Sequence, residues 1–297
     1  MPDIEAKQEM KNVLLTIAYD GTGFCGWQKQ PGQRSVQSEV ERALSIVCAQ
    51  PIQINGTSRT DAGVHAYGQR ASFAADFSIP IEKIPMVANG IFASAASQKT
   101  RKNCGDVAIL AAEEVPEDFH ARFSAVGKKY IYKINYSDQP DPFHRDQCYQ
   151  ISRTLDFSAM ERAAAHLAGT KDFKCFQAAG GKELETTVRT IFAARISQAD
   201  HIGAVPAVSR CAKQKKSDFL FEVIGDGFLY NMVRIITGTL VDAGLGKIDP
   251  DDLPAIINGR DRRHAGHTAP PQGLYLSEVF YESGALQEAA AAVMERR

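Results

Sequence analysis

Arg59 and Asp61 stand on either side of a threonine in the run SRTDAGVHA, residues 58–66. Gly63 follows the acid closely and permits backbone angles that are closed to other residues, so this loop can present Asp61 to a pocket. A carboxylate on such a rigid turn can serve as a nucleophile or as a base. An aspartate before small residues also commonly makes an Asx turn with its own backbone. The local spacing therefore leaves a catalytic and a structural role open.

The composition is that of a soluble globular protein, with 44% hydrophobic and 23% charged residues in 297. This length suits two domains of ordinary size and a substantial core. Because the formal net charge is −1, any nucleic-acid contact must use a local basic patch. Three clusters qualify, although each can also be a solvated face: Arg122, Lys128, Lys129 and Lys133; Arg210, Lys213, Lys215 and Lys216; Arg260, Arg262 and Arg263.

The six cysteines are scattered at spacings that suggest neither a zinc site nor a redox pair. The N-terminus carries no secretory signal, so we expect reduced thiols in a cytoplasmic protein. No apolar stretch approaches the length needed to span a membrane. We therefore expect neither a metal nor a membrane partner.

The first half of the chain alternates between strand and helix patterns. Residues 13–19 alternate as a strand does, and Ser35 is the expected N-cap of a helix over residues 36–47. The other expected elements are strands over 52–54, 69–73 and 107–110, and a helix over 80–91 that begins at Pro80.

The second half repeats the order β-α-β-β-α-β. Its expected elements are strands over 129–135, 190–196, 219–224 and 274–280, and helices over 157–167, 230–243, 253–257 and 284–297, with a long loop over 197–217. This repeat predicts an α/β (α+β) fold of two tandem ferredoxin-like units, with mainly antiparallel sheets joined around a central cleft. The expected domains are residues 11–117, which carry the Asp61 loop, and residues 118–297.

Segments along nearly the whole chain resemble the tRNA pseudouridine synthase A family. Residues 58–66 resemble its signature, whose RTDAGVH core is long and specific. The other similar segments follow in the family's order: YDGTGFCGWQ at 19–28, FHARFSA at 119–125, KKYIY at 128–132, NMVR at 231–234 and TAPPQGLYL at 268–276. The chain departs from the family where Ser58 replaces the usual glycine, after Asn89, and at apparent insertions near 97–105 and 204–216.

The resemblance implies that the protein isomerises uridine to pseudouridine in RNA. The N1–C1′ bond of the nucleotide breaks, the uracil rotates, and its C5 bonds to C1′. No redox step and no net hydrolysis occur, so no cofactor is expected. The resemblance assigns the catalytic step to Asp61, which either attacks the sugar or base or removes a proton from the sugar. The sequence leaves these routes open.

The resemblance also assigns partners to Asp61. Arg234 is expected to keep the carboxylate ionised and to orient it through two hydrogen bonds, although its position also fits a helix-surface arginine. Tyr130 is expected to stack on the uracil, and Tyr132 to belong to the core. Leu274 packs against the base or only against the core. The residues expected to grip phosphates, and so to offset the cost of flipping the uridine out, are Arg59, Arg122, Lys128 and Lys129.

The substrate that the resemblance implies is the anticodon stem-loop of tRNA, at tRNA positions 38 to 40, bound by a homodimer. Three other functions stay open. One is the same chemistry on another RNA, such as ribosomal RNA. Another is a non-catalytic RNA-binding protein, because RNA-recognition modules also use ferredoxin-like units. The third is a hydrolase that uses Asp61, which lacks a second acid nearby.

Overall fold

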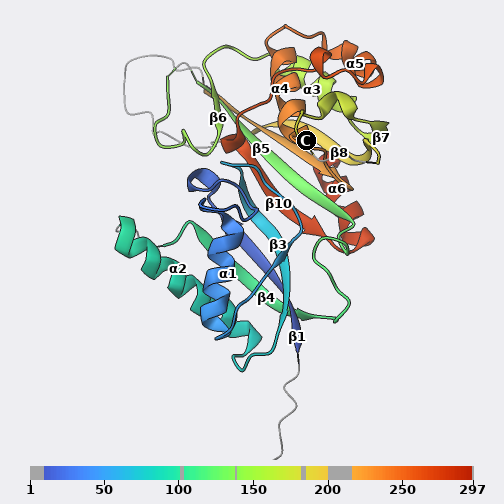
Figure 1. Ribbon diagram of the computed structural model, residues 1–297. Coiled ribbons are helices and arrows are strands. Elements are labelled where there is room, and N and C mark those ends of the chain that lie inside the picture. Colours follow the sequence, from blue (N-terminus) through green and yellow to red (C-terminus); the bar gives the residue numbers. More distant parts are fainter. Residues whose placement is uncertain (1–9, 101–103, 138, 182–184, 200–215, 296–297) are drawn as a thin grey trace, which may run out of the picture. The chain divides into compact units, whose positions relative to one another are not determined.

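The computed structural model describes residues 10–100, 104–137, 139–181, 185–199 and 216–295 (Figure 1). The chain divides into two compact units, Met1–Ala125 and Val126–Arg297. Residues 118–125, which the sequence analysis placed in the second domain, belong to the first unit. The reason is that hydrogen bonds tie this segment to strand residues of the first unit. Asn12 Nδ2 donates to the carbonyl of Phe119 at 2.9 Å, and the Ala121 N–H donates to Ser72 Oγ at 3.1 Å.

The first unit has the predicted order β-α-β-β-α-β. Its elements are β1 (Lys11–Tyr19), α1 (Val36–Val47), β2 (Asn55–Gly56), β3 (His65–Ala75), α2 (Ile84–Thr100) and β4 (Val107–Val115). The strands lie in the order β4-β1-β3-β2, and each neighbouring pair is antiparallel. This is the fourth-first-third-second order of a ferredoxin-like unit.

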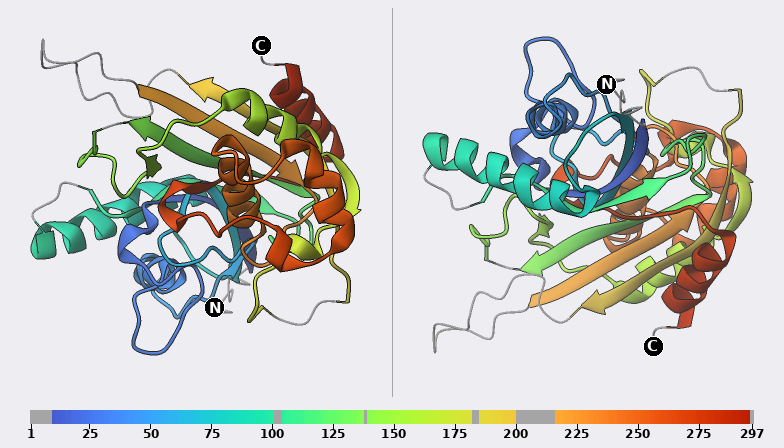
Figure 2. Two further views of the ribbon diagram at one scale, coloured as in Figure 1. Left: turned by 90° about the horizontal axis from the view of Figure 1, so that it is seen from above. Right: turned by 90° about the horizontal axis from the view of Figure 1, so that it is seen from below.

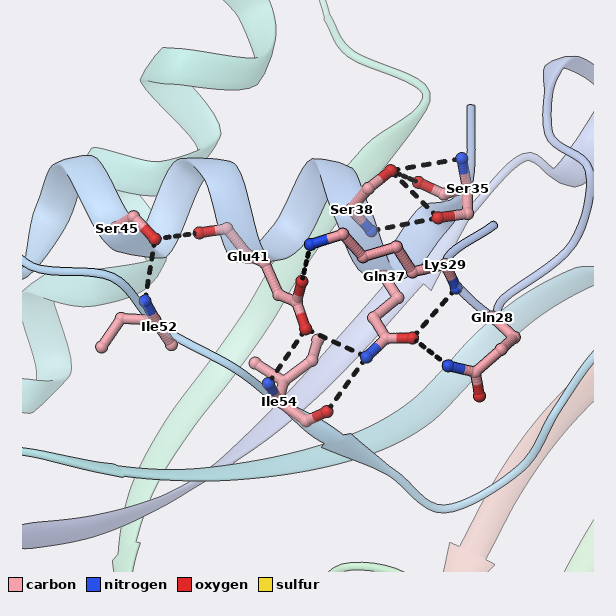
Figure 3. Close-up of polar contacts among 9 residues, drawn as sticks. All are labelled: Gln28, Lys29, Ser35, Gln37, Ser38, Glu41, Ser45, Ile52 and Ile54. Carbon is pink, nitrogen blue, oxygen red and sulfur yellow. Dashed lines mark hydrogen bonds and ion pairs between the residues drawn. The ribbon is translucent and has the colours of Figure 1, made fainter. Parts of the chain in front are cut away.

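Ser35 caps α1 as predicted: its side chain accepts a hydrogen bond from the Ser38 N–H, and Ser38 reciprocates. The strand predicted over 52–54 is wrong, and β2 begins only at Asn55. Figure 3 shows the reason: side chains of α1 take up the backbone groups of this segment. The Ile52 N–H donates to Ser45 Oγ at 2.9 Å, and the Ile54 N–H donates to Glu41 Oε1 at 3.3 Å. The helix predicted over 80–91 begins later, at Ile84, and continues to Thr100.

The second unit contains the same four-strand order with additions. Its strands are β5 (Gly127–Ser137), β6 (Tyr149–Ile151), β7 (Gly169–Asp172), β8 (Val188–Ala199), β9 (Lys216–Gly225) and β10 (Leu274–Phe280). Its helices are α3 (Phe157–Ala165), α4 (Met232–Gly244), α5 (Leu253–Gly259) and α6 (Ser283–Glu295). The sheet order is β10-β5-β9-β8-β7, all antiparallel, and the short β6 pairs with β5 in parallel. The α+β class and the mainly antiparallel sheets are thus confirmed.

Helices cover both faces of the sheet in the second unit. Phe219 of β9 stacks on Phe157 of α3, with ring centroids 5.8 Å apart. Ile224 packs in a buried cluster with Leu286 and Val293 of α6, and Figure 2 shows α6 in dark red alongside this sheet. Because positions 219 and 224 of one strand point to opposite faces, α3 and α6 lie on opposite sides. Alternate side chains of β5 therefore point to the α3 face and to the α6 face of the sheet.

The described cysteines are free thiols: Cys25, Cys48, Cys104, Cys148 and Cys175; Cys211 lies outside the described residues. Within the described ranges, no group of three or more His, Cys, Asp or Glu side chains could hold a metal ion. None of the helices that the structure describes is both long enough and apolar enough to cross a membrane.

We expect Cys175 to resist alkylation in the native protein. Burial raises the pKa of its thiol to about 12, so almost none of the reactive thiolate forms at pH 8. Iodoacetamide should label Cys175 at least ~100-fold more slowly than the exposed Cys104, as followed by peptide mass spectrometry. In denaturant the two rates should converge. Equal native rates would contradict the buried position of Cys175.

Candidate active site

Asp61 lies half-buried on a tight turn that leads into β3. The Val64 N–H donates to the Asp61 carbonyl at 3.2 Å, and Gly63 adopts a φ of +78°. A turn closed in this way with a positive φ at its third residue has the pattern of a type II turn, where glycine is preferred. The expected use of Gly63 is therefore confirmed. The hydrogen bond that closes the turn joins two backbone groups, and it fixes the backbone direction at Asp61.

Four hydrogen bonds from three residues hold the segment that precedes Asp61. Gln69, whose side chain is fully buried, donates from Nε2 to the Ser58 carbonyl at 2.7 Å and accepts from the Ser58 N–H at 3.2 Å. The Tyr19 hydroxyl lies 2.7 Å from Thr60 Oγ1. The Trp27 N–H donates to the Thr60 carbonyl at 3.0 Å. Each such bond contributes about 1 kcal/mol, so together they leave the loop little freedom.

Two glycines let neighbouring backbone approach the loop closely. Gly26 has a φ of +106°, and a Cβ placed there would lie 2.5 Å from the Thr60 carbonyl oxygen. A Cβ at Gly21 would lie 2.1 Å from the Val64 carbonyl oxygen. Both distances are shorter than a side chain tolerates. Residues 19–28, a segment that resembles the family, therefore pack directly against the Asp61 loop and support it.

His65 supports the turn from the strand that follows it. The ring is buried, and its Nδ1 accepts from the Gly21 N–H at 3.1 Å. Asp20 Oδ1 lies 3.3 Å from the same nitrogen. His65 thereby connects the end of the loop to the turn after β1.

A partly buried polar network between α1 and residues 28–29 holds the segment that contains Trp27 (Figure 3). Gln37 Oε1 accepts from the Lys29 N–H at 3.0 Å and from Gln28 Nε2 at 2.8 Å. Gln37 Nε2 donates to Glu41 at 2.9 Å, and the Lys29 ammonium pairs with the other Glu41 oxygen at 3.3 Å. This network was not predicted from the sequence, because Gln28 and Lys29 lie 8 to 12 residues from their partners on α1.

In the second unit, Tyr130 and Leu274 share one face of the sheet. Tyr130 lies opposite Leu276, and Tyr132 lies opposite Leu274, so the four side chains point to the same side. Tyr130 is 8% exposed and meets the ring of Phe228 edge-on, with centroids 5.1 Å apart.

Tyr132 has the core role that the sequence predicts. It is fully buried, and its hydroxyl donates to the Pro270 carbonyl at 2.6 Å. Burial raises the pKa of the Tyr132 hydroxyl well above its usual value, while the charge of Arg234 opposes this rise.

Arg234 stands in the first turn of α4, where its side chain is directed by two contacts. Its Nε donates to the Ala269 carbonyl at 2.8 Å, and its guanidinium donates to Asn231 Oδ1 at 2.8 Å. Asn231 adopts a left-handed conformation with a φ of +59°, which non-glycine residues hold only when their surroundings require it. Arg234 is therefore an oriented guanidinium rather than a mobile helix-surface arginine.

The structure separates Lys129 from Tyr130. Lys129 lies opposite Ile224 and so points to the α6 face, whereas Tyr130 and Lys128 point to the other face. The Lys129 ammonium forms an ion pair of 2.7 Å with the buried Glu222 carboxylate. The expected cluster of phosphate-gripping lysines is thus split, and Lys129 balances a buried charge.

The remaining basic residues differ in exposure and in the hydrogen bonds and ion pairs that they form. Arg59 and Arg122 are exposed. In the third cluster, Arg262 donates to the Gly266 carbonyl at 2.8 Å, while Arg260 pairs with Asp172 at 3.1 Å and Arg263 pairs with Asp261 at 2.6 Å. In the second cluster, Arg210, Lys213 and Lys215 lie outside the described residues.

We expect Gly26→Ala to lower the free energy of unfolding by at least ~2 kcal/mol, because the new Cβ strains the backbone and displaces Thr60. Gly32→Ala is the matched control: its φ is +71°, and nothing lies within 4 Å of the added Cβ. The control should lose only about 1 kcal/mol, the strain of a positive φ. Urea denaturation measures both. Equal losses would mean that the Thr60 contact is not tight.

Known proteins resemble the chain over most of its length. A family model described as tRNA pseudouridine synthase matches residues 15–124 and 163–282. The tRNA pseudouridine synthase A of Acetivibrio thermocellus is 42% identical over 272 residues, covering 92% of this chain and 100% of the relative. The proteins of that name from Ruminiclostridium cellulolyticum and Bacillus pumilus are 40% and 41% identical, covering 92% and 91% of this chain and 100% and 99% of their own. With its Asp61 turn seated as described, the chain belongs to the tRNA pseudouridine synthase family, enzymes that isomerise uridine to pseudouridine.

Proposed function

We propose that this enzyme converts uridine to pseudouridine in the anticodon stem-loop of tRNA, at tRNA positions 38 to 40, and that Asp61 is its catalytic carboxylate. The observation that carries the proposal is the seating of the Asp61 turn by Gln69, Tyr19 and Trp27. A reacting group held within a fraction of an ångström gains much of the rate advantage of an intramolecular reaction. The family model supports the reaction class.

The reaction needs one ionised carboxylate. It is an isomerisation, so substrate and product contain the same atoms. Asp61 either attacks the sugar or base or removes a proton from the sugar, and the N1–C1′ bond breaks. The freed uracil rotates within the pocket, and its C5 forms the new bond to C1′. The C5 proton then leaves to solvent, while N1 gains a proton. Release of the C5 hydrogen is therefore a direct readout of the complete reaction.

We propose that Arg234 keeps Asp61 ionised, since a pocket dry enough for uracil otherwise favours the protonated acid. Its support is the fixed direction of the guanidinium, which Ala269 and Asn231 hold. Tyr130 stacks on the uracil, and Leu274 packs beside it. The shared face of β5 and β10 supports this pair.

The phosphates of the tRNA backbone bind cationic side chains. We propose Arg59, Arg122 and Lys128 for this contact, because the first two are exposed and the third shares the face of Tyr130. Lys129 can join them only by breaking its ion pair with the buried Glu222 carboxylate, and breaking a buried ion pair costs several kcal/mol.

We also propose that the enzyme works in the cytoplasm as a homodimer, on the strength of the family resemblance. Light scattering coupled to size exclusion would give twice the mass of the chain. A mass equal to one chain at micromolar concentration would contradict the dimer.

The substrate is tested with RNA that carries tritium at uracil C5. The wild-type enzyme should release label from tRNA but not from ribosomal RNA, and sequencing should place the pseudouridines at positions 38 to 40. Ribosomal RNA transcripts of equal length serve as the control for nonspecific release. Label released only from ribosomal RNA, or only from tRNA outside the anticodon stem-loop, would contradict the proposed substrate.

Arg234→Lys keeps the positive charge but removes the planar fork. We expect kcat for tritium release to fall at least ~100-fold, the size of effect seen when one stabilising donor is removed from an active site. Arg262→Lys is the matched control, since Arg262 also donates to backbone carbonyls of the second unit. The control should stay near wild type. Near-wild-type activity in Arg234→Lys would remove Arg234 from the mechanism.

A further inference from the structure

The side chain of Phe123 is 77% exposed, on a turn at the end of the first unit. The turn is held rigidly: the Ser124 N–H donates to the His120 carbonyl at 2.9 Å, and His120 Nδ1 accepts from the N–H groups of Arg122 at 3.1 Å and Phe123 at 3.4 Å. The His120 ring lies against the Phe123 ring, with centroids 4.4 Å apart. An aromatic ring is thus fixed in position while its surface faces water.

A cation accompanies this ring. The guanidinium carbon of Arg122 lies 5.6 Å from the centre of the Phe123 ring, and Arg122 is itself exposed. An aromatic face beside an arginine is the combination that proteins use to bind single-stranded nucleic acid: the ring stacks on a base, and the cation meets the backbone.

The same turn is attached to the frame of the Asp61 loop. Thr57, one residue before that loop, donates from Oγ1 to the Ala121 carbonyl at 2.9 Å, and its N–H donates to the Arg70 carbonyl at 2.9 Å. The Ala121 N–H donates to Ser72 Oγ on β3. The position of Phe123 is therefore coupled, within the first unit, to the start of the loop that carries Asp61.

We propose that Phe123 is a stacking platform for an unpaired base of the bound tRNA, with Arg122 on the adjacent phosphate. The inference rests on the proposed function for the identity of the RNA. A protein partner would need a wider apolar interface core, whereas Phe123 is flanked by the exposed Arg122 and the half-buried His120 and Ser124. A single rigid ring with a cation fits a nucleobase.

Phe123→Ala should raise the Kd for tRNA about 10-fold, the loss expected for one base–aromatic stack. KM should rise with it, while kcat at saturating tRNA stays within about twofold of wild type, because the ring is proposed to bind RNA rather than to react. Phe123→Trp should restore binding, since indole also stacks. Phe143→Ala is the matched control, a ring 78% exposed in the second unit, and it should change neither constant. Equal Kd values for Phe123→Ala and Phe143→Ala would overturn the proposal.

Fluorescence gives a readout that does not depend on catalysis. The chain has one tryptophan, Trp27, which is buried, so Phe123→Trp adds a single exposed indole. Stacking on a base should quench the added emission when tRNA is titrated, and subtraction of the wild-type titration removes the contribution of Trp27. Binding without this quenching would overturn the platform. If wild type released no tritium from tRNA while quenching persisted, the proposed function would fail and the stacking site would stand.

Discussion

The Asp61 loop depends on one constraint: backbone groups that are buried outside a strand ladder must find partners among side chains. Ser58 is buried, and its N–H and carbonyl both meet the side-chain amide of Gln69, which imitates a neighbouring strand. Leaving such a group without a partner costs about 1–3 kcal/mol. The buried Ser58 hydroxyl has no hydrogen-bond partner among the described residues, so it adds a cost of the same kind.

This constraint explains why the segments that resemble the family act as supports. Trp27 and Gly26 contact the Thr60 backbone, and Tyr19 contacts the Thr60 hydroxyl. His65 joins the end of the turn to Gly21 of the same segment. The turn itself is closed by a backbone hydrogen bond from the Val64 N–H to the Asp61 carbonyl. In the second unit, hydrogen bonds likewise orient Arg234, whose side chain donates to Asn231 Oδ1 and to the Ala269 carbonyl.

Elements with a clear period were predictable from the sequence, and so were residues with a local capping or turn role. Ser35 and Gly63 are examples. Ser35 caps its helix through Ser38, three residues later, and Gly63 supplies the positive φ of its own turn. The strand over 52–54 was wrong, since its apolar residues are buried while α1 side chains take its backbone bonds. The short strands β6 and β7 were missed because three or four residues show no period. The role of Lys129 could not be predicted, because Glu222 faces it from another strand.

We propose that the Asp61 carboxylate does the chemistry and that the rest of the loop holds it in place. Asp61→Asn changes one oxygen to an amide nitrogen and should leave the turn and the affinity for tRNA intact. Single-turnover release of tritium from C5-labelled tRNA, with enzyme in excess over RNA, measures this catalytic role of Asp61. We expect no release by Asp61→Asn above the rate without enzyme, and tRNA binding within about threefold of wild type. Release by Asp61→Asn at a rate close to wild type would show that the carboxylate does not carry the reaction.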